Sequence, residues 1–180
     1  QAAKQSGQQI VMKPGDYQIA DRKGLVFSGS DNEVELSGVK LDVPIEVASG
    51  RNLFQLTGSN ITIRGGSIED TYPGGSTEVN DFGSYNQGRK YGRMNEMVIR
   101  GDNNRVIGMK MIIRGSYPYG YGNMFGIGGG SVLRLRKHCG IQITGNDAVI
   151  DGCQIKMEAF GHAIFVQGGN RTTVRNTIVE

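Results

Sequence analysis

The chain has 180 residues, a net charge of +3, 29 glycines and no tryptophan. No apolar run reaches the roughly eighteen residues of a membrane-spanning helix, so the sequence predicts no membrane partner. The net charge is small and the familiar nucleic-acid-binding motifs are missing, so we expect no nucleic-acid partner either. A chain of this length can bury a core, and its many glycines suit one domain, residues 1–180, with frequent tight turns.

Residues 1–24 are expected to form an entry coil that caps one end of the domain. A segment containing Ala and Gln opens the chain, residues 10–12 form an apolar run, and Pro14 and Gly15 follow as a turn signal. A short helix at the start would cover a sheet edge that would otherwise be open.

One short pattern then occurs five times. Each copy has apolar residues at its first and third positions, a glycine at or near the fifth, and apolar residues near the tenth and fifteenth. Alternating apolar residues predict short strands that are half buried on one face. A spacing of 23 residues between Ile141 and Ile164 predicts stacked coils, an all-β solenoid of about five to six turns. The copies begin at Leu25, Phe54, Met97, Ile141 and Ile164.

Three details of this pattern decide which residues face the core. In the third copy we expect one extra residue after the glycine, which makes Ile107 and Ile112 core residues. In the last copy the glycine is taken as Gly168. In the first copy Val39 is aligned with Ile68 of the second.

Two copies carry long insertions, at residues 69–96 and 113–140. Both follow the last core position of their copy, so they are expected to leave the solenoid at the same corner and to form the walls of a groove. Six of the seven tyrosines fall inside them. Aromatic rings suit the flat faces of sugars, although packing around small hydrophobic clusters in the loops is an alternative explanation.

The insertions also gather basic residues, and residues 113–140 include no acidic one. This charge favours a polyanionic ligand. The Leu-Arg-Leu-Arg alternation at 133–136 also fits an ordinary strand with one solvated face, and that alternative stays open. The expected substrate-binding residues are Tyr117, Tyr121, Arg134, Arg136, Lys137, His138, Arg89 and Lys90.

Asparagines recur close to the turns between strands. We expect their side chains to form a ladder in which each amide bonds to the next coil, with sugar binding as the alternative. They are Asn60, Asn103, Asn104, Asn146 and Asn170.

No strong metal or cofactor motif is present. The chain has neither HExxH nor paired CxxC spacing, and the Gly-rich run at 126–131 lacks the ending of a phosphate-binding loop. The two cysteines, Cys139 and Cys153, fall at different positions of the pattern and are expected to be buried thiols rather than a disulfide. Ca²⁺ is a possible cofactor at the corner, although scattered carboxylates are usually solvated or paired with arginine. The carboxylates concerned are Glu69, Asp70, Glu78 and Asp81.

The Ile-x-Ile-x-Gly coils, together with Val-Ile-Asp-Gly-Cys-Gln-Ile at 149–155 and Gly-His-Ala-Ile-Phe-Val at 161–166, resemble the right-handed parallel β-helix of the pectate-lyase-like superfamily. The resemblance covers residues 10–180. The chain lacks the Asn-Thr-Asp, Gly-His-Gly and Arg-Ile-Lys motifs of polygalacturonases and the Arg-x-Pro-x-x-Arg pattern of pectate lyases. It is more similar to the β-helical alginate lyases and related uronate-polymer lyases. This resemblance implies a secreted or periplasmic protein that cleaves an acidic polysaccharide, such as alginate, by β-elimination.

Elimination next to a uronate needs a group that neutralises the carboxylate, a base that removes the proton α to it, and an acid that protonates the leaving oxygen. We expect Arg114 to hold the carboxylate, Lys156 to be the base and Tyr119 to be the acid. Lys156 is predicted to point outward near Arg114, in line with Ile113, Glu69 and Lys40 of earlier coils. Cationic neighbours would favour the neutral amine that a base needs. A solvated strand lysine is the alternative.

His162 and His138 are rival candidates for the base, because histidine titrates near neutral pH. His162 aligns with Cys139 and His138 aligns with Gly161, so we expect the two rings to stack on neighbouring coils. Either histidine could instead be a hydrogen-bonded corner residue.

The sequence therefore predicts one right-handed parallel β-helix, continuing beyond residue 180 in the natural protein, that acts as a polysaccharide lyase. A non-catalytic carbohydrate-binding or tailspike-like β-helix is the first alternative. A glycoside hydrolase is the second, and it would need two opposed carboxylates in the groove. The pattern does not indicate an oligomeric state.

Overall fold

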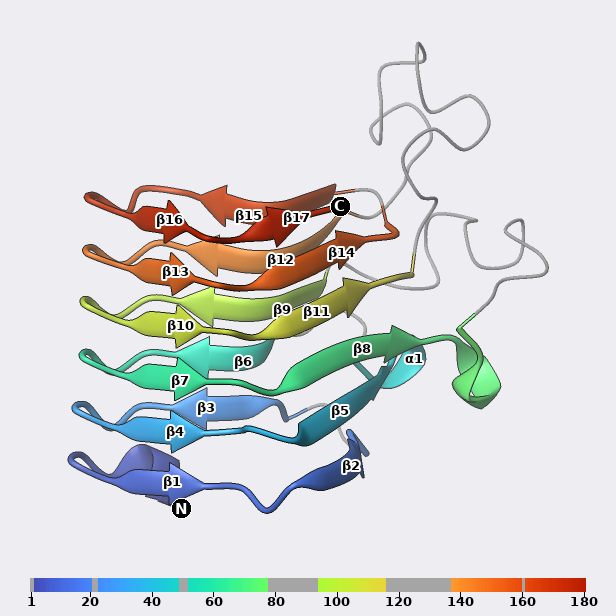
Figure 1. The fold of residues 1–180 in the computed structure, drawn as a ribbon, viewed down its shortest axis with the longest axis horizontal. Coiled ribbons are helices and arrows are strands. Elements are labelled where there is room, and N and C mark those ends of the chain that lie inside the picture. The colour runs from blue at the N-terminus through green and yellow to red at the C-terminus, as the bar shows by residue number, and fades with distance from the viewer. Residues whose placement is uncertain (1, 21–22, 49–51, 78–93, 116–136, 160) are drawn as a thin grey trace, which may run out of the picture.

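The computed structural model describes residues 2–20, 23–48, 52–77, 94–115, 137–159 and 161–180. Within these residues the chain makes repeated turns of three short strands, and each turn stacks on the one before it (Figure 1). Equivalent strands of neighbouring turns pair in parallel. The fold is the expected right-handed parallel β-helix.

Three parallel sheets, named A, B and C, run along the solenoid. Sheet A consists of β1 (Gln9–Val11), β4 (Glu33–Glu35), β7 (Thr62–Arg64), β10 (Arg105–Ile107), β13 (Val149–Asp151) and β16 (Thr173–Arg175). Sheet B consists of β2 (Gly15–Gln18), β5 (Val39–Pro44), β8 (Ser67–Thr71), β11 (Lys110–Ile113), β14 (Gln154–Met157) and β17 (Ile178–Val179). Sheet C consists of β3 (Leu25–Phe27), β6 (Asn52–Leu56), β9 (Met94–Ile99), β12 (His138–Ile143) and β15 (Gly161–Val166). The described helices are η1 (Ala2–Lys4), α1 (Ile45–Ala48) and η2 (Pro73–Gly75), and no described helix is long and apolar enough to cross a membrane.

The first residues of the five sequence copies lie in one column of sheet C. The register pairs them in the predicted order from β3 to β15. Their side chains alternate with outward-facing ones, as the period of two in a strand requires. The inward side chains of the three sheets form one continuous hydrophobic core, which includes Phe54, Ile63, Met97 and Ile155.

The third copy differs from the prediction because no extra residue follows Gly101. Val106 and Met111, rather than Ile107 and Ile112, occupy the core columns. In both strands two neighbouring residues are apolar, so the alternation in the sequence could not show which of them faces inward.

Two further positions are shifted. Leu41, rather than Val39, pairs with Ile68. Gly169, rather than Gly168, lies against Gly145. At this column the backbones of successive coils approach so closely that a Cβ atom on one residue would collide with a carbonyl oxygen one coil away, which restricts the column to glycine. Its members are Gly29, Gly58, Gly101, Gly145 and Gly169.

Polar side chains connect the coils at the turn between sheets C and A. Asn104 is fully buried: its amide donates to the carbonyls of Gly58 and Gly101, and its Oδ1 accepts the Ile61 N–H at 2.8 Å. An amide-to-amide ladder is present where Asn170 donates to Asn146 at 3.1 Å. The predicted ladder is thus confirmed for this pair.

At the first coil, η1 takes the place of a sheet C strand. The backbone N–H groups of Ser28 and Gly29 donate to the carbonyl of Ala3. The described residues therefore place one 3₁₀ turn beside β3, and the expected amphipathic helix over the first coil stays a prediction. Cys139 and Cys153 are buried and form no disulfide, as expected.

Candidate functional site

The two long segments leave and rejoin the solenoid at one corner. The first leaves after β8 and returns at β9, and the second leaves after β11 and returns at β12 (Figure 1). These strands are neighbours in sheets B and C, so the predicted common corner is confirmed for the described ends of both segments. Several predicted site residues lie outside the described residues: Tyr117, Tyr119, Tyr121, Arg134, Arg136, Arg89 and Lys90.

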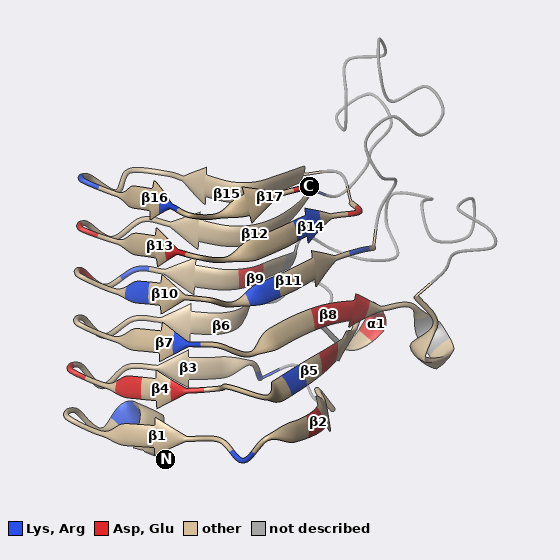
Figure 2. Ribbon diagram, viewed as in Figure 1, with Lys and Arg blue, Asp and Glu red and all other residues tan. Residues whose placement is uncertain are grey.

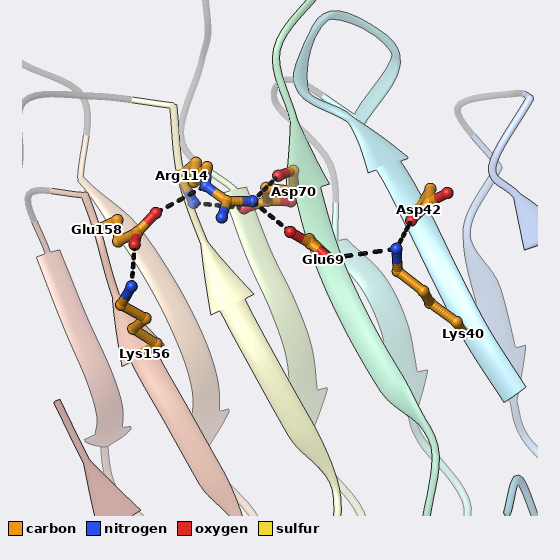
Figure 3. Close-up of polar contacts among 7 residues, drawn as sticks. All are labelled: Lys40, Asp42, Glu69, Asp70, Arg114, Lys156 and Glu158. Atoms are coloured by element: carbon orange, nitrogen blue, oxygen red, sulfur yellow. Dashed lines mark hydrogen bonds and ion pairs between the residues drawn. The ribbon is translucent and has the colours of Figure 1, made fainter. Parts of the chain in front are cut away.

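The outer face of sheet B carries charges of both signs next to this corner (Figure 2). Figure 3 shows one connected series of charged side chains on this face. They come from β5, β8 and β14 and from the residues just after β11 and β14. We call this series the charged row. Its members, in order of contact, are Asp42, Lys40, Glu69, Arg114, Glu158 and Lys156.

Charges alternate in sign along the whole row. Lys40 Nζ lies 3.2 Å from Asp42 and 3.3 Å from Glu69. This bridge is needed because Asp42 and Glu69 are directly opposite each other in the register, where two like charges would repel. Arg114 next bridges Glu69 to Glu158, which contacts Lys156 at 2.5 Å.

Arg114 is the most buried member of the row, with a side chain only 8% exposed. Its Nε donates to Glu158 at 2.7 Å, and its Nη1 donates to Glu69 at 2.8 Å and to the backbone carbonyl of Asp70 at 2.7 Å. Burial opposes the charge, but the two carboxylates outweigh it and raise the pKa of Arg114. Because Nε and Nη1 are already engaged, the observed contacts favour a structural ion-pair role over a free carboxylate clamp.

Lys156 projects from the outer face of β14, and its side chain is 52% exposed. It lies near Arg114 as expected, since both contact Glu158 (Figure 3). Its equivalents on earlier coils are Ile112, Glu69 and Asp42, so the predicted alignment is correct at β8, one residue off at β11 and two residues off at β5. Its direct contact is a carboxylate, whereas the sequence reasoning expected cationic neighbours.

Two hollows flank Lys110 on the same outer face. The first, of about 280 Å³, lies over β11, β14 and β17, and both Lys110 and Lys156 line it together with Ile112 and Ile178. The second, of about 350 Å³, is lined by Lys110, Lys40, two serines and four glycines at the turn between sheets A and B. Lysines of β5, β11 and β14 therefore line the two hollows on this face, whereas β8, between β5 and β11, contributes none. The serines and glycines are Ser37, Ser67, Gly38, Gly65, Gly66 and Gly108.

On the inner side of the corner, buried acids lie behind the row. Asp70 and Glu96 are completely buried, and their carboxyl groups share a hydrogen bond. Burial raises the pKa of Asp70 to about 8 and raises that of Glu96 well above its usual value. The sequence argument treated Asp70 as a surface carboxylate and did not identify Glu96, because an acidic residue beside a core position gives no periodic signal.

The two histidines do not come together. His138 pairs with Gly161 and His162 pairs with Cys139, as aligned, but neighbouring positions of a strand face opposite sides. His138 is completely buried, and burial lowers its pKa to about 4. The expected stack is therefore wrong, and His138 is out of reach of a ligand on the outer face.

His162 belongs to sheet C, where its ring stacks on Phe165 at 5.0 Å between centroids. Lys156 and the rest of the charged row belong to sheet B and to the residues that follow its strands. Lys137 is exposed immediately before β12.

The described residues contain no group of three His, Cys, Asp or Glu side chains that could hold a metal ion. Of the four carboxylates considered for Ca²⁺, Glu69 is paired with Lys40 and Arg114, and Asp70 is buried. Glu78 and Asp81 lie outside the described residues.

Comparison with known proteins adds no assignment: no protein-family model matches the chain, and no curated protein sequence matches it significantly. What the site can do therefore depends on its own residues. An outward face with spaced lysines, hydroxyl groups and aliphatic patches can bind an elongated anion that also presents apolar sugar faces.

Proposed function

We propose that this β-helix binds an acidic, uronate-containing polysaccharide such as alginate on the outer face of sheet B and cleaves it by β-elimination. The supporting observation is that Lys110 and Lys156 line one hollow beside the corner from which both long segments leave. The sequence resemblance to β-helical uronate-polymer lyases of the pectate-lyase-like superfamily supports the same class of reaction.

The alternation of the charged row supplies an anion-binding position at its end. Four of the six members lie between charges of opposite sign. The two ends are Asp42 and Lys156, and Lys156 is the positive end and is half exposed. A carboxylate placed between Lys156 and Lys110 would continue the alternation. Strands of neighbouring coils are about 4.8 Å apart, close to the length of one sugar residue, so a chain lying along the axis meets one coil per sugar.

In the proposed reaction, Lys156 removes the proton α to the uronate carboxylate. The electrons of that C–H bond form a carbon–carbon double bond, the bond to the glycosidic oxygen breaks, and Tyr119 gives that oxygen a proton. Lys110 or Arg114 would neutralise the carboxylate while charge develops on it. The engaged donors of Arg114 favour Lys110 for this task.

Non-catalytic binding of the same polysaccharide is the second candidate. It is favoured by the direct contact of Lys156 with Glu158, because an ion-paired ammonium can bind an anion without accepting a proton. Binding alone needs only the exposed lysines and the hollow.

A hydrolase fits less well. Glu69 and Glu158 lie on opposite sides of Arg114, but a general acid needs a raised pKa. Burial raises the pKa of Glu69 and of Glu158, but their ion pairs with lysine and arginine lower it by more. The pKa of each carboxyl group is therefore below its usual value. Neither carboxylate is therefore suited to protonate a leaving group at neutral pH.

The test is to incubate the chain with alginate, pectate, hyaluronan and chondroitin, and to record both binding and the ultraviolet absorbance of unsaturated uronates. Lys156→Ala should reduce turnover by roughly 10²- to 10⁴-fold, as loss of a positioned base does, and should weaken binding much less, because Lys110 still lines the hollow. Lys4→Ala, an exposed lysine on η1, is the matched control and should keep full turnover. Binding without absorbance supports the second candidate, and absence of binding to every acidic polymer refutes both.

A further inference from the structure

Four buried polar residues mark the four points where the long segments leave and rejoin the sheets. Asp70 lies in β8, where the first segment leaves, and Glu96 lies in β9, where it returns. Arg114 follows β11, where the second segment leaves, and His138 begins β12, where it returns. All four are at least nine-tenths buried, so each of these four points carries a buried polar side chain.

Asp70 connects the two departing ends directly. Its Oδ2 accepts the backbone N–H of Arg114 at 3.0 Å, and its backbone carbonyl accepts Arg114 Nη1 at 2.7 Å. Among the described residues, no N–H group donates to Asp70 Oδ1 or to either oxygen of Glu96. The two carboxyl groups instead bond to each other, and a hydrogen bond between two carboxyl groups requires a proton.

We propose that Asp70 and Glu96 form a protonated carboxyl pair, a lock that holds the roots of both long segments in place until it is deprotonated at alkaline pH. The lock goes beyond the proposed function, because it is required whether or not the protein cleaves a polysaccharide.

The surrounding groups hold a proton more tightly on Glu96 than on Asp70. The backbone N–H of Arg114 and its positive charge both lower the pKa of Asp70. The negative charge of the nearby Glu69 raises that pKa. Glu96 meets only burial and Asp70, and both raise its pKa. His138, on the neighbouring strand of sheet C, is neutral because burial lowers its pKa to about 4. Tyr72 completes the surroundings, with a pKa raised chiefly by burial.

The pH dependence follows from these directions. A carboxyl group whose pKa is raised by folding stabilises the fold fully below its unfolded pKa and loses that contribution as pH rises towards the folded value. For this pair, stability begins to fall above the ordinary carboxyl pKa values of 3.8 and 4.5. The loss continues up to about pH 8, where Asp70 titrates, and to higher pH for Glu96.

Glu96→Gln tests the lock, because glutamine has nearly the same shape, stays neutral and can still donate to Asp70. Urea titrations give the unfolding constant of each protein. The constant of the natural chain divided by that of the variant should rise about tenfold per pH unit between about pH 5 and 8. The reason is that the natural chain releases the proton of Glu96 on unfolding, and the variant has no such proton. Glu35→Gln is the control. Glu35 is exposed with a lowered pKa, so its profile should stay parallel to that of the natural chain across this window. Parallel profiles for Glu96→Gln would overturn the proposal.

A second measurement covers the case in which Glu96→Gln does not fold. Difference infrared spectra of the natural chain should show the C=O stretch of a protonated carboxyl at about pH 7 and its loss at about pH 10. Over the same range the exchange of the Arg114 amide, corrected for its intrinsic rate, should lose protection. Absence of the protonated-carboxyl band at neutral pH overturns the lock. Lyase assays play no part in either readout, so failure of the lock and failure of the proposed function are separate results.

Discussion

Replacing Arg114 tests whether this arginine holds the corner together or is available for a ligand. Arg114→Met keeps the aliphatic stem and removes three charge-assisted hydrogen bonds, to Glu158, Glu69 and the Asp70 carbonyl. At roughly 1.5–3 kcal/mol each, these bonds sum to about 4.5–9 kcal/mol before compensation. Glu69 and Glu158 keep their lysines and regain some water, because their side chains are 17% and 30% exposed. We therefore expect a net loss of about 3–5 kcal/mol in the free energy of unfolding, the usual cost of removing one partner of a buried ion pair.

Arg171→Met is the matched control. Arg171 donates to both carboxylate oxygens of Asp147, at 2.6 and 2.7 Å, but its side chain is 69% exposed. Water can replace an exposed ion pair of this kind. The urea midpoint of Arg171→Met should therefore shift no more than that of an ordinary surface substitution. Far-ultraviolet circular dichroism is the suitable signal, since the chain has no tryptophan. Equal shifts for the two variants would refute the reasoning. A fully stable Arg114→Met that no longer binds acidic polysaccharides would show that the guanidinium serves the ligand instead.

Two further predictions concern the coil-to-coil bonds and the carboxylates of the charged row. Asn104→Ala should lower the free energy of unfolding by about 2–4 kcal/mol, because it leaves the buried Ile61 N–H without an acceptor. Asn170→Ala, which removes an exposed amide bonded to Asn146, should cost less than about 0.5 kcal/mol. Similar urea midpoints for the two variants would contradict this. Folding lowers the pKa of Glu69 and Glu158 below the usual 4.5, so their contribution to stability is present above that value and is lost as pH falls through the folded values. Urea midpoints should therefore fall below about pH 4, and Arg114→Met should weaken this acid dependence.

Much of the scaffold was predictable because each coil repeats the same apolar columns. The starting residues of all five copies and the common corner of the two segments follow from periodicity and turn signals. The errors occurred where the period is ambiguous. Val106 and Ile107 are both apolar, as are Met111 and Ile112, and only the ladder of neighbouring strands decides which one faces the core.

The candidate site was predictable only in outline. The outward direction of Lys156 and its nearness to Arg114 follow from strand alternation, and Glu158 could have been found as the second residue after Lys156, on the same face. The burial of Asp70, Glu96 and His138 could not be predicted, because in a single sequence a buried polar residue gives no apolar period and looks like a surface residue. Assignments that depend on residues 78–93 and 116–136 remain predictions.

Arg114 belongs both to the lock and to the charged row, and this has a thermodynamic consequence. Its backbone N–H and Nη1 bind Asp70 on the inner side, while its Nε binds Glu158, the partner of Lys156, on the outer side. An anion that binds Lys156 competes with Glu158 and so changes the charge that Arg114 faces. Any such change alters the preference of Asp70 for its ionised form, and linkage requires the reverse effect to be equal in free energy. The proposed lock and the proposed anion site at Lys156 are therefore expected to be coupled through the Arg114 guanidinium.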